Sequence, residues 1–386
     1  MTASPEVLEI RVLRLPLIER FTTSRSSESV REFLLLRWIG AQSEGWAECA
    51  AGPRPLHFEE FIAGAIDVLE SDLVPLVTAN GPVTASRARE LMLGVPGNRN
   101  AKAALEAAIL DAELRAHDMA MSDYLGGTVR RVPVGVSVGI APDIRTLLDR
   151  VDTYLGDGYR RIKLKIRPGW DVEPVAAVRR AFGDEVLLQV DANEAYRPAD
   201  GLLLRRLDDF GLVLLEQPFP RSDLIGHARL AQDLSVPICL DESITSLHSA
   251  ALAISLGACE IVNIKPARVG GYLEARSIHD LCMGHGIPVF CGGVLESGVG
   301  RAANLALASL PNFELPGDIS ATDRYYEQDI TQRFELDDGC IAIPTGPGSG
   351  AVVDMDAVRR FTKEQRTVRL AASRTSVSAG PNGGSN

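Results

Sequence analysis

The amino-acid sequence predicts an α/β fold in which a parallel β/α barrel follows an α+β domain. Four short apolar runs each end in a charged residue, at nearly even intervals. The charges are Asp191, Glu216, Asp241 and Lys265, which lie 25, 25 and 24 residues apart. Apolar runs without alternation are typical of strands buried on both faces. Each interval has room for one helix, so the pattern predicts a parallel sheet built from strand–helix–strand units.

The residues before the barrel, 1–127, favour an α+β domain. Strand-like runs are expected at 7–15 and 33–39, joined by a polar segment, and helical stretches at 58–76 and 101–120. At 386 residues the chain is longer than one ordinary barrel, which agrees with two domains.

The barrel itself is expected at residues 128–318. Its strands are expected at 132–137, 162–166, 186–190, 212–215, 236–240, 261–264, 287–291 and 312–315. Apolar positions at helical spacing predict a helix at 198–210, and small residues predict another at 246–257, stopped by Gly257. About eight units over roughly 190 residues is the scale of a (β/α)₈ barrel. The rival, a doubly wound open sheet, would not bring five consecutive strand ends around one point.

The C-terminal residues differ again. Residues 319–370 return to short strand-like pieces, such as 340–343, which we expect to pack on the N-terminal domain. Residues 371–386 have low complexity and predict a disordered tail.

Composition limits the classes of function. A net charge of −11 argues against nucleic acid or an anionic membrane as a partner. The sequence contains no run of 18 apolar residues, so no membrane span is expected. The first residues do not have the pattern of a secretion signal, so a cytoplasmic location is expected. The six cysteines form no CxxC pair and are expected to be buried free thiols.

Three carboxylates at adjacent strand ends predict a metal site. Asp191, Glu216 and Asp241 would repel one another strongly without a cation, and oxygen-only ligands favour Mg²⁺ over Zn²⁺, with Mn²⁺ as a substitute. The alternative is three unrelated acids, each capping the next helix. Asn193 and Glu242 are expected to support the ligands or contact a substrate, or else to form turns.

Lysines lie on both sides of the acids in strand order. Lys163 and Lys165 share one strand face, and Lys265 follows the acids. A lysine acts as a base only when its pKa falls, and Lys163, the metal and Arg268 are candidates to lower it. Two lysines across a metal-bound carboxylate suit proton transfer at its α-carbon, with the metal stabilising the enediolate. The alternative is that these lysines bind an anion or are solvated charges.

The order of these motifs resembles the enolase superfamily, muconate-lactonizing subgroup. The motifs are Lys163-x-Lys165, Asp191-Ala-Asn, Glu216-Gln-Pro, Asp241-Glu-Ser and Lys265-Pro-x-Arg-Val-Gly-Gly. Within the subgroup the chain is most similar to the o-succinylbenzoate synthase / N-acylamino acid racemase family. This resemblance is carried further by residues 29–37, 102–114, 134–140, 292–304 and 315–326, and it covers about residues 5–370.

The resemblance implies a (β/α)₇β TIM-like barrel, capped at its mouth by the N-terminal domain, which the C-terminal segment completes. It implies Mg²⁺ on the three carboxylates and acid/base roles for Lys165 and Lys265. It also implies that a mobile loop at residues numbered in the 20s places Phe21 near the substrate. Further pocket residues by resemblance are Ser137, Gly293, Leu295 and Tyr325. Arg25 and Glu28 depart from the glycine-richer, more apolar loop that is expected, which leaves the acyl-group preference open.

Two reactions share this machinery. Dehydration to o-succinylbenzoate, a step of the menaquinone pathway, needs one lysine as base and acid. Racemisation of an N-acylamino acid needs both lysines, and Arg268 beside Lys265 is consistent with tuning that base. The alternatives are a dipeptide epimerase, for which only Asp318 is present where an Asp-x-Asp is common, a muconate cycloisomerase, and a non-catalytic metal-binding barrel. The expected partners are a small-molecule carboxylate and further copies of the chain in a homo-oligomer.

Overall fold

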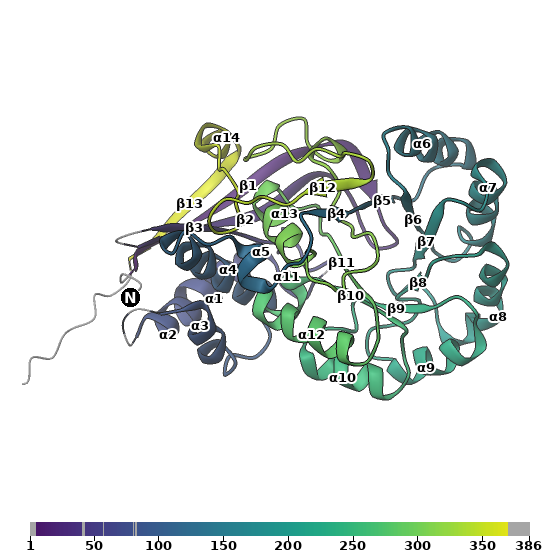
Figure 1. Ribbon diagram of the computed structural model, residues 1–386, viewed down its shortest axis with the longest axis horizontal. Coiled ribbons are helices and arrows are strands. Elements are labelled where there is room, and N and C mark those ends of the chain that lie inside the picture. Colours follow the sequence, from purple (N-terminus) through teal and green to yellow (C-terminus); the bar gives the residue numbers. More distant parts are fainter. Residues whose placement is uncertain (1–4, 41–42, 57, 80, 82, 370–386) are drawn as a thin grey trace, which may run out of the picture.

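The computed structural model describes residues 5–40, 43–56, 58–79, 81 and 83–369. A four-stranded antiparallel sheet with its helices forms one part, and a parallel barrel ringed by helices forms the other (Figure 1). The predicted fold class is therefore confirmed. The tail predicted at 371–386 lies outside the described residues.

The antiparallel sheet has the strand order β13-β1-β2-β3. Its strands are β1 (Pro5–Thr22), β2 (Ser27–Gly40), β3 (Glu44–Cys49) and β13 (Thr362–Arg369). Alternate residues of β2 are buried on opposite faces: Leu34 and Leu36 belong to the large core, and Phe33 and Leu35 to a second core. The C-terminal strand β13 pairs with β1, so the end of the described chain completes the first domain.

The predicted runs at 7–15 and 33–39 lie inside β1 and β2, but the strands extend further. Phe21 pairs with Glu28 and Thr22 with Ser27, so the turn is only residues 23–26. Much of the polar segment expected as a connector is therefore a β-hairpin, because backbone pairing resumes after an irregularity between Pro16 and Phe21.

The helices of this domain follow β3. They are α1 (Ile62–Val68), a π-helical turn (Leu69–Leu73), α2 (Val74–Thr78), α3 (Ala85–Met92), α4 (Arg99–Ala116) and α5 (Met121–Leu125). The helix predicted at 101–120 ends earlier, at Ala116, and Asp118 then takes a left-handed φ of 50°. A Cβ at Gly45 would lie 2.1 Å from the carbonyl oxygen of Ala108, so glycine permits the close packing of β3 on α4.

The parallel sheet has seven strands, and each strand pairs with the next one along the chain. They are β5 (Gly135–Val138), β6 (Arg161–Lys165), β7 (Leu187–Asp191), β8 (Leu215–Glu216), β9 (Ile238–Leu240), β10 (Ile261–Ile264) and β11 (Val289–Cys291).

The prediction of a strand at 312–315 is wrong, but this segment closes the barrel. Phe313 makes a single parallel bridge to Val289 of β11, and Gly317 makes one to Val134 beside β5. Prolines at 311 and 316 flank the segment and donate no backbone hydrogen bond, which explains why the ladder does not continue.

Helices surround the strands on the outer face of the barrel (Figure 1). They are α6 (Ile144–Gly156), α7 (Val172–Phe182), α8 (Gly201–Leu204), α9 (Leu224–Asp233), α10 (Leu247–Ser255), α11 (Pro266–Val269), α12 (Tyr272–Gly284) and α13 (Gly298–Leu307). Ser246 caps α10 and Gly257 has φ 62° just beyond it, as the sequence predicts. The helix predicted at 198–210 is only partly α-helical, because 3₁₀ turns at Pro198–Asp200 and Arg205–Phe210 flank α8.

The segment 340–343 does not pack as predicted. Its strand β12 (Cys340–Ala342) pairs with β4 (Arg131–Pro133), just before the first barrel strand, and not with the antiparallel sheet. A 3₁₀ turn (Thr322–Arg324) precedes it, and α14 (Met355–Phe361) follows and leads into β13.

All six cysteines are free thiols, and five of them are buried, with Cys340 half-buried. In the described part of the chain, no helix has the length and apolar character to cross a membrane.

A buried carboxylate joins the two parts of the molecule. Glu106 of α4, which is fully buried, accepts hydrogen bonds from the backbone N–H groups of Tyr272 (2.6 Å) and Leu273 (3.1 Å). These are the first residues of α12, whose free N–H groups favour a negative charge. Burial nonetheless raises the pKa of Glu106 from 4.5 to about 7, against the effect of these hydrogen bonds.

We predict that Glu106→Gln changes the pH dependence of stability. The unfolded chain releases this proton near pH 4.5, whereas the folded chain keeps it up to about pH 7. Raising the pH across this window therefore stabilises the unfolded state of the wild type, and glutamine removes that effect. The variant should gain on the order of 2–3 kcal/mol relative to the wild type between about pH 5 and about pH 8, measured by thermal or urea unfolding. The exposed Glu90→Gln is the control, and parallel pH curves for Glu106→Gln and the wild type would contradict the prediction.

Candidate active site

The charged residues singled out by their spacing meet at the carboxyl end of the barrel. The strand register pairs Lys165 with Asp191, and Asp191 with Glu216, so β6, β7 and β8 carry one row of charges. Asp241 follows β9 and Lys265 follows β10, which continues the row around the barrel. The three carboxylate residues are at most 1% exposed. Parallel strands in regular register thus turn an even sequence spacing into spatial proximity.

On one side, two lysines of β6 contact the acids. The Lys165 ammonium donates to Asp191 and, at 3.0 Å, to Oδ1 of Asn193. The Lys163 ammonium donates to Oε2 of Glu216 at 3.0 Å and lies 3.7 Å from Oδ2 of Asp191. Both side chains point into the same site, as expected from their shared strand face.

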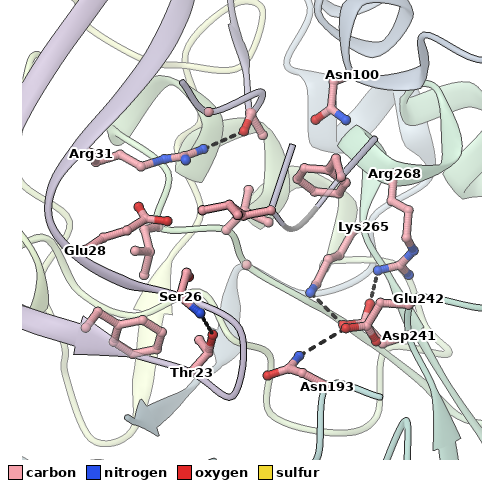
Figure 2. Close-up of a pocket in the computed structure, with 18 of the residues that line it drawn as sticks. Thr23, Ser26, Glu28, Arg31, Asn100, Asn193, Asp241, Glu242, Lys265 and Arg268 are labelled. Atoms are coloured by element: carbon pink, nitrogen blue, oxygen red, sulfur yellow. Dashed lines mark hydrogen bonds and ion pairs between the residues drawn. The ribbon is translucent and has the colours of Figure 1, made fainter. Parts of the chain in front are cut away.

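On the other side, Asp241 receives two cations. The Lys265 ammonium lies 2.7 Å from Oδ2 of Asp241, and the Arg268 guanidinium donates to Oδ1 (Figure 2). Arg268 is fixed by further donation to the carbonyl of Ile244 at 2.7 Å. The Arg268 side chain therefore holds Asp241 and does not act on Lys265 alone.

Asn193 and Glu242 link the two sides. Asn193 accepts from Lys165 and donates from Nδ2 to Oε1 of Glu242 at 3.1 Å (Figure 2). Its backbone N–H donates to Asp191 at 2.9 Å, and its φ of 44° lies in the left-handed region. Asn193 is therefore both a turn residue and a contact of Lys165, which combines the two readings left open by the sequence.

The pKa of Lys265 moves in the direction opposite to the sequence expectation. Burial lowers it, but the surrounding carboxylates, Glu216 foremost, outweigh burial and raise the pKa. The pKa of Lys163 is raised in the same way, by Asp318 and Glu216 against burial. Lys163 and Arg268 were expected to lower the pKa of Lys265, but each of them is ion-paired with an acid. Burial lowers the pKa of Arg268 itself to about 9.

The three carboxylates each contact a cation of the chain in this arrangement. Within the described ranges, no group of three or more His, Cys, Asp or Glu side chains is positioned to hold a metal ion. Lysine and arginine groups contact the oxygens of these carboxylates. The donor chemistry still fits a hard divalent cation, since all three groups are buried carboxylates and such a cation would supply the countercharge that Lys163, Lys165 and Lys265 now provide.

A cavity of about 310 Å³ lies above these residues and is also lined by the antiparallel domain. All five residues that the resemblance assigned to the pocket line this cavity: Phe21, Ser137, Gly293, Leu295 and Tyr325. The rings of Phe21 and Tyr325 meet edge to face, with centroids 6.3 Å apart. The hairpin β1–β2 thus brings Phe21 to the same cavity as the lysines.

The turn of this hairpin is tied to the barrel by charge. Arg25 forms an ion pair with Glu194 and donates from Nε to the carbonyl of Asn193 at 3.1 Å. Arg221 also binds Glu194, at 2.9 Å, and reaches Glu59 of the first domain at 2.7 Å. Arg25, which departs from the family pattern, is therefore a contact between the two domains.

Sequence reasoning missed part of the charge network. Asp318 was considered only as a contact for a substrate ammonium, yet it forms ion pairs with Lys163 and, at 2.8 Å, with Arg161. The two cations lower the pKa of Asp318 although burial raises it. One signal was available, because Asp318 follows the closing segment of the barrel just as the other acids follow their strands. No comparable signal identified Glu194, which binds Arg25 and Arg221, or Arg31, which lines the cavity.

Comparison with known proteins agrees with this geometry. Residues 146–357 match the family model described as enolase C-terminal domain-like. An N-succinylamino acid racemase from Amycolatopsis sp. is 57% identical over 343 residues, which cover 89% of this chain and 93% of that protein. An o-succinylbenzoate synthase from Geobacillus kaustophilus is 44% identical over 365 residues, covering 94% and 97%.

A solved structure agrees with both. The crystal structure of an enolase-superfamily member from Listeria innocua superposes with a TM-score of 0.92 at 37% identity, over 96% of this chain and all of that one. The chain therefore belongs to the enolase superfamily, within the group that contains o-succinylbenzoate synthases and N-succinylamino acid racemases.

Proposed function

We propose that this protein removes the proton α to a carboxylate, and that it acts as an N-succinylamino acid racemase, an o-succinylbenzoate synthase, or both. The observation that supports this best is the placement of two buried lysines, Lys165 and Lys265, at opposite ends of the row of carboxylates in one cavity. Relatives that are 44–57% identical carry these two names. A small-molecule carboxylate is the substrate class.

Asp191, Glu216 and Asp241 would hold Mg²⁺, with Mn²⁺ as a substitute. Members of the superfamily generally use Mg²⁺. When bound, the cation would supply the positive charge that stabilises the negative charge of a substrate carboxylate after proton loss.

Lys165 and Lys265 are proposed to exchange the α-proton. As the residues stand, carboxylates raise the pKa of Lys265, which favours the protonated form and a role as acid. A divalent cation held by Asp191, Glu216 and Asp241 would offset the effect of Glu216 and Asp191 on the pKa of Lys265, so that burial, which lowers the pKa, would count for more. Asn193 holds the Lys165 ammonium in position through its 3.0 Å contact.

The two reactions make different demands on this pair. Racemisation needs a lysine on each face of the α-carbon, whereas dehydration needs one lysine, and the second can remain a cation near the developing negative charge. Both lysines lie in the cavity, so both activities are consistent with the site.

The alternatives have less support. A dipeptide epimerase would need an acid for the substrate ammonium, but Asp318 already binds Lys163 and Arg161. A muconate cycloisomerase would use the same strand-end residues and is tested by turnover of a muconate. A non-catalytic barrel would have no reason to keep both lysines beside the acids.

We also propose the domain limits 1–127, 128–318 and 319–370, a cytoplasmic location, and a homo-oligomer. The pairing of β13 with β1 supports the assignment of the third segment to the capping sheet.

The first prediction for this site concerns the lysines. In D₂O, the wild type should incorporate deuterium at the α-carbon of both enantiomers of an N-succinylamino acid. Lys165→Ala and Lys265→Ala should each lower this exchange on the order of 10²- to 10⁴-fold, because general acid/base groups contribute that much. The control is Lys363→Ala, whose side chain is 62% exposed. No exchange from either enantiomer by the wild type would contradict racemisation, and o-succinylbenzoate formation would then test the other activity.

The second prediction concerns the metal. Isothermal titration calorimetry of the chelator-treated protein should detect Mg²⁺ binding, and Asp191→Asn, Glu216→Gln and Asp241→Asn should each weaken the affinity on the order of 100-fold. Loss of an indirect support already costs 10–100-fold in such sites. Asp356→Asn is the control, since its side chain is 87% exposed. Unchanged Mg²⁺ affinity in all three variants would remove these residues from the metal site.

A further inference from the structure

Among the described residues, one buried cation of the cavity has no acidic partner. Arg31, on β2, is only 5% exposed and lines the cavity. Its Nη2 donates to the carbonyl oxygen of Ala50 at 2.7 Å, and its buried Nε has no hydrogen-bond partner in the described part of the chain. In that part, no acid lies within ion-pair distance of the guanidinium.

Such a charge is expensive to bury alone, because a guanidinium removed from water needs a compensating anion. Glu48 on β3 is near enough to sense Arg31, but burial, reinforced by Glu296, raises the pKa of Glu48 to about 8. The carboxyl is therefore mostly protonated at neutral pH and does not balance Arg31. It is engaged instead by the N–H (2.8 Å) and Oγ (2.6 Å) of Ser297.

The cavity leaves room beside this guanidinium. Gly52 lines the same cavity, and a Cβ there would lie 3.7 Å from Nη1 of Arg31, so a larger side chain would cover that nitrogen. Figure 2 shows Arg31 entering from the capping domain, with Lys265 and Asp241 on the far side of the pocket. The positive charge thus faces the reactive groups across the space that a substrate would fill.

Other cations of the cavity do not match this description. Arg268 is buried but paired with Asp241, and Arg221 is paired with Glu194. Arg54 and Arg99 also line the cavity, but Arg54 is exposed and Arg99 is only half-buried.

We propose that Arg31 determines acyl-group specificity by binding the distal carboxylate of a dicarboxylic acyl group, such as succinyl. This inference rests on the proposed function, because it assumes that the substrate's α-carbon lies between Lys165 and Lys265. A planar guanidinium suits a carboxylate, and Nη1, which lies beside Gly52, is the donor that remains available toward the cavity.

The test compares two acyl groups of the same shape. The substrates are the N-succinyl derivative of one amino acid and its N-(3-carbamoylpropanoyl) analogue, in which a neutral amide replaces the distal carboxylate. The measurement is kcat/KM for α-proton exchange in D₂O. The wild type should prefer the succinyl compound on the order of 10- to 100-fold, the range for a hydrogen bond between charged groups. In Arg31→Gln this ratio should fall to about one while exchange of the neutral analogue is largely retained.

Two further variants sharpen the test. Arg31→Lys keeps the charge and should keep part of the preference. Arg14→Gln removes an exposed charge of the same domain outside the cavity and should leave the ratio as in the wild type. An equal fall of the ratio in that variant would show that the general positive field of the domain sets the preference, and would overturn the assignment.

The remaining outcomes are also decisive. A wild-type ratio near one overturns the assignment even where Arg31→Gln does not fold. A loss of kcat/KM in Arg31→Gln that is equal for both substrates also overturns it, because such a loss indicates a structural role. Absence of exchange from both substrates in the wild type instead contradicts the racemase activity on which this inference rests, and the inference falls with it.

Discussion

Charge balance in the buried carboxyl end of the barrel is the constraint on which this structure depends. Three acids follow one another around it with lysines on both sides, and almost none of these side chains is exposed. Each carboxylate of the row is in contact with at least one ammonium or guanidinium group: Asp191 with Lys165, Glu216 with Lys163, and Asp241 with Lys265. Removal of one member would leave its partner buried and uncompensated, which costs more than the pair contributes when intact. The set therefore acts as a unit.

The same balance decides what the lysines can do. Neighbouring acids hold the proton on Lys265, so basicity is not a property of that residue alone. It depends on how much negative charge remains unpaired around it. A site of this kind couples the protonation of its bases to the binding of any cation by its acids, which is a physical reason for lysines and carboxylates to occur together in one barrel.

Much of this could be predicted because the information is local. Strand–helix units of regular length place residues 25 positions apart at neighbouring strand ends, so Asp191, Glu216 and Asp241 could be grouped without a structure. Contacts between distant segments could not. Such contacts include the pairing of β12 with β4 and the ion pair between Arg25 and Glu194. The lack of an acidic partner for Arg31 among the described residues likewise depends on which segments fold around it. The predicted direction of the pKa shift of Lys265 was also wrong, because a correct prediction required knowing which cations were already paired with acids.

The pairing of β13 with β1 has a consequence for how the molecule is assembled. Val7 is aligned with Arg369, so the whole barrel is synthesised between the two strands of this contact. While the ribosome is still producing the barrel, β1 lacks its neighbour on one side and presents unpaired backbone groups to other nascent chains. Contacts of such long sequence separation form slowly, since a large loop must close first. The antiparallel sheet is therefore completed only after the barrel that separates β1 from β13 has been made.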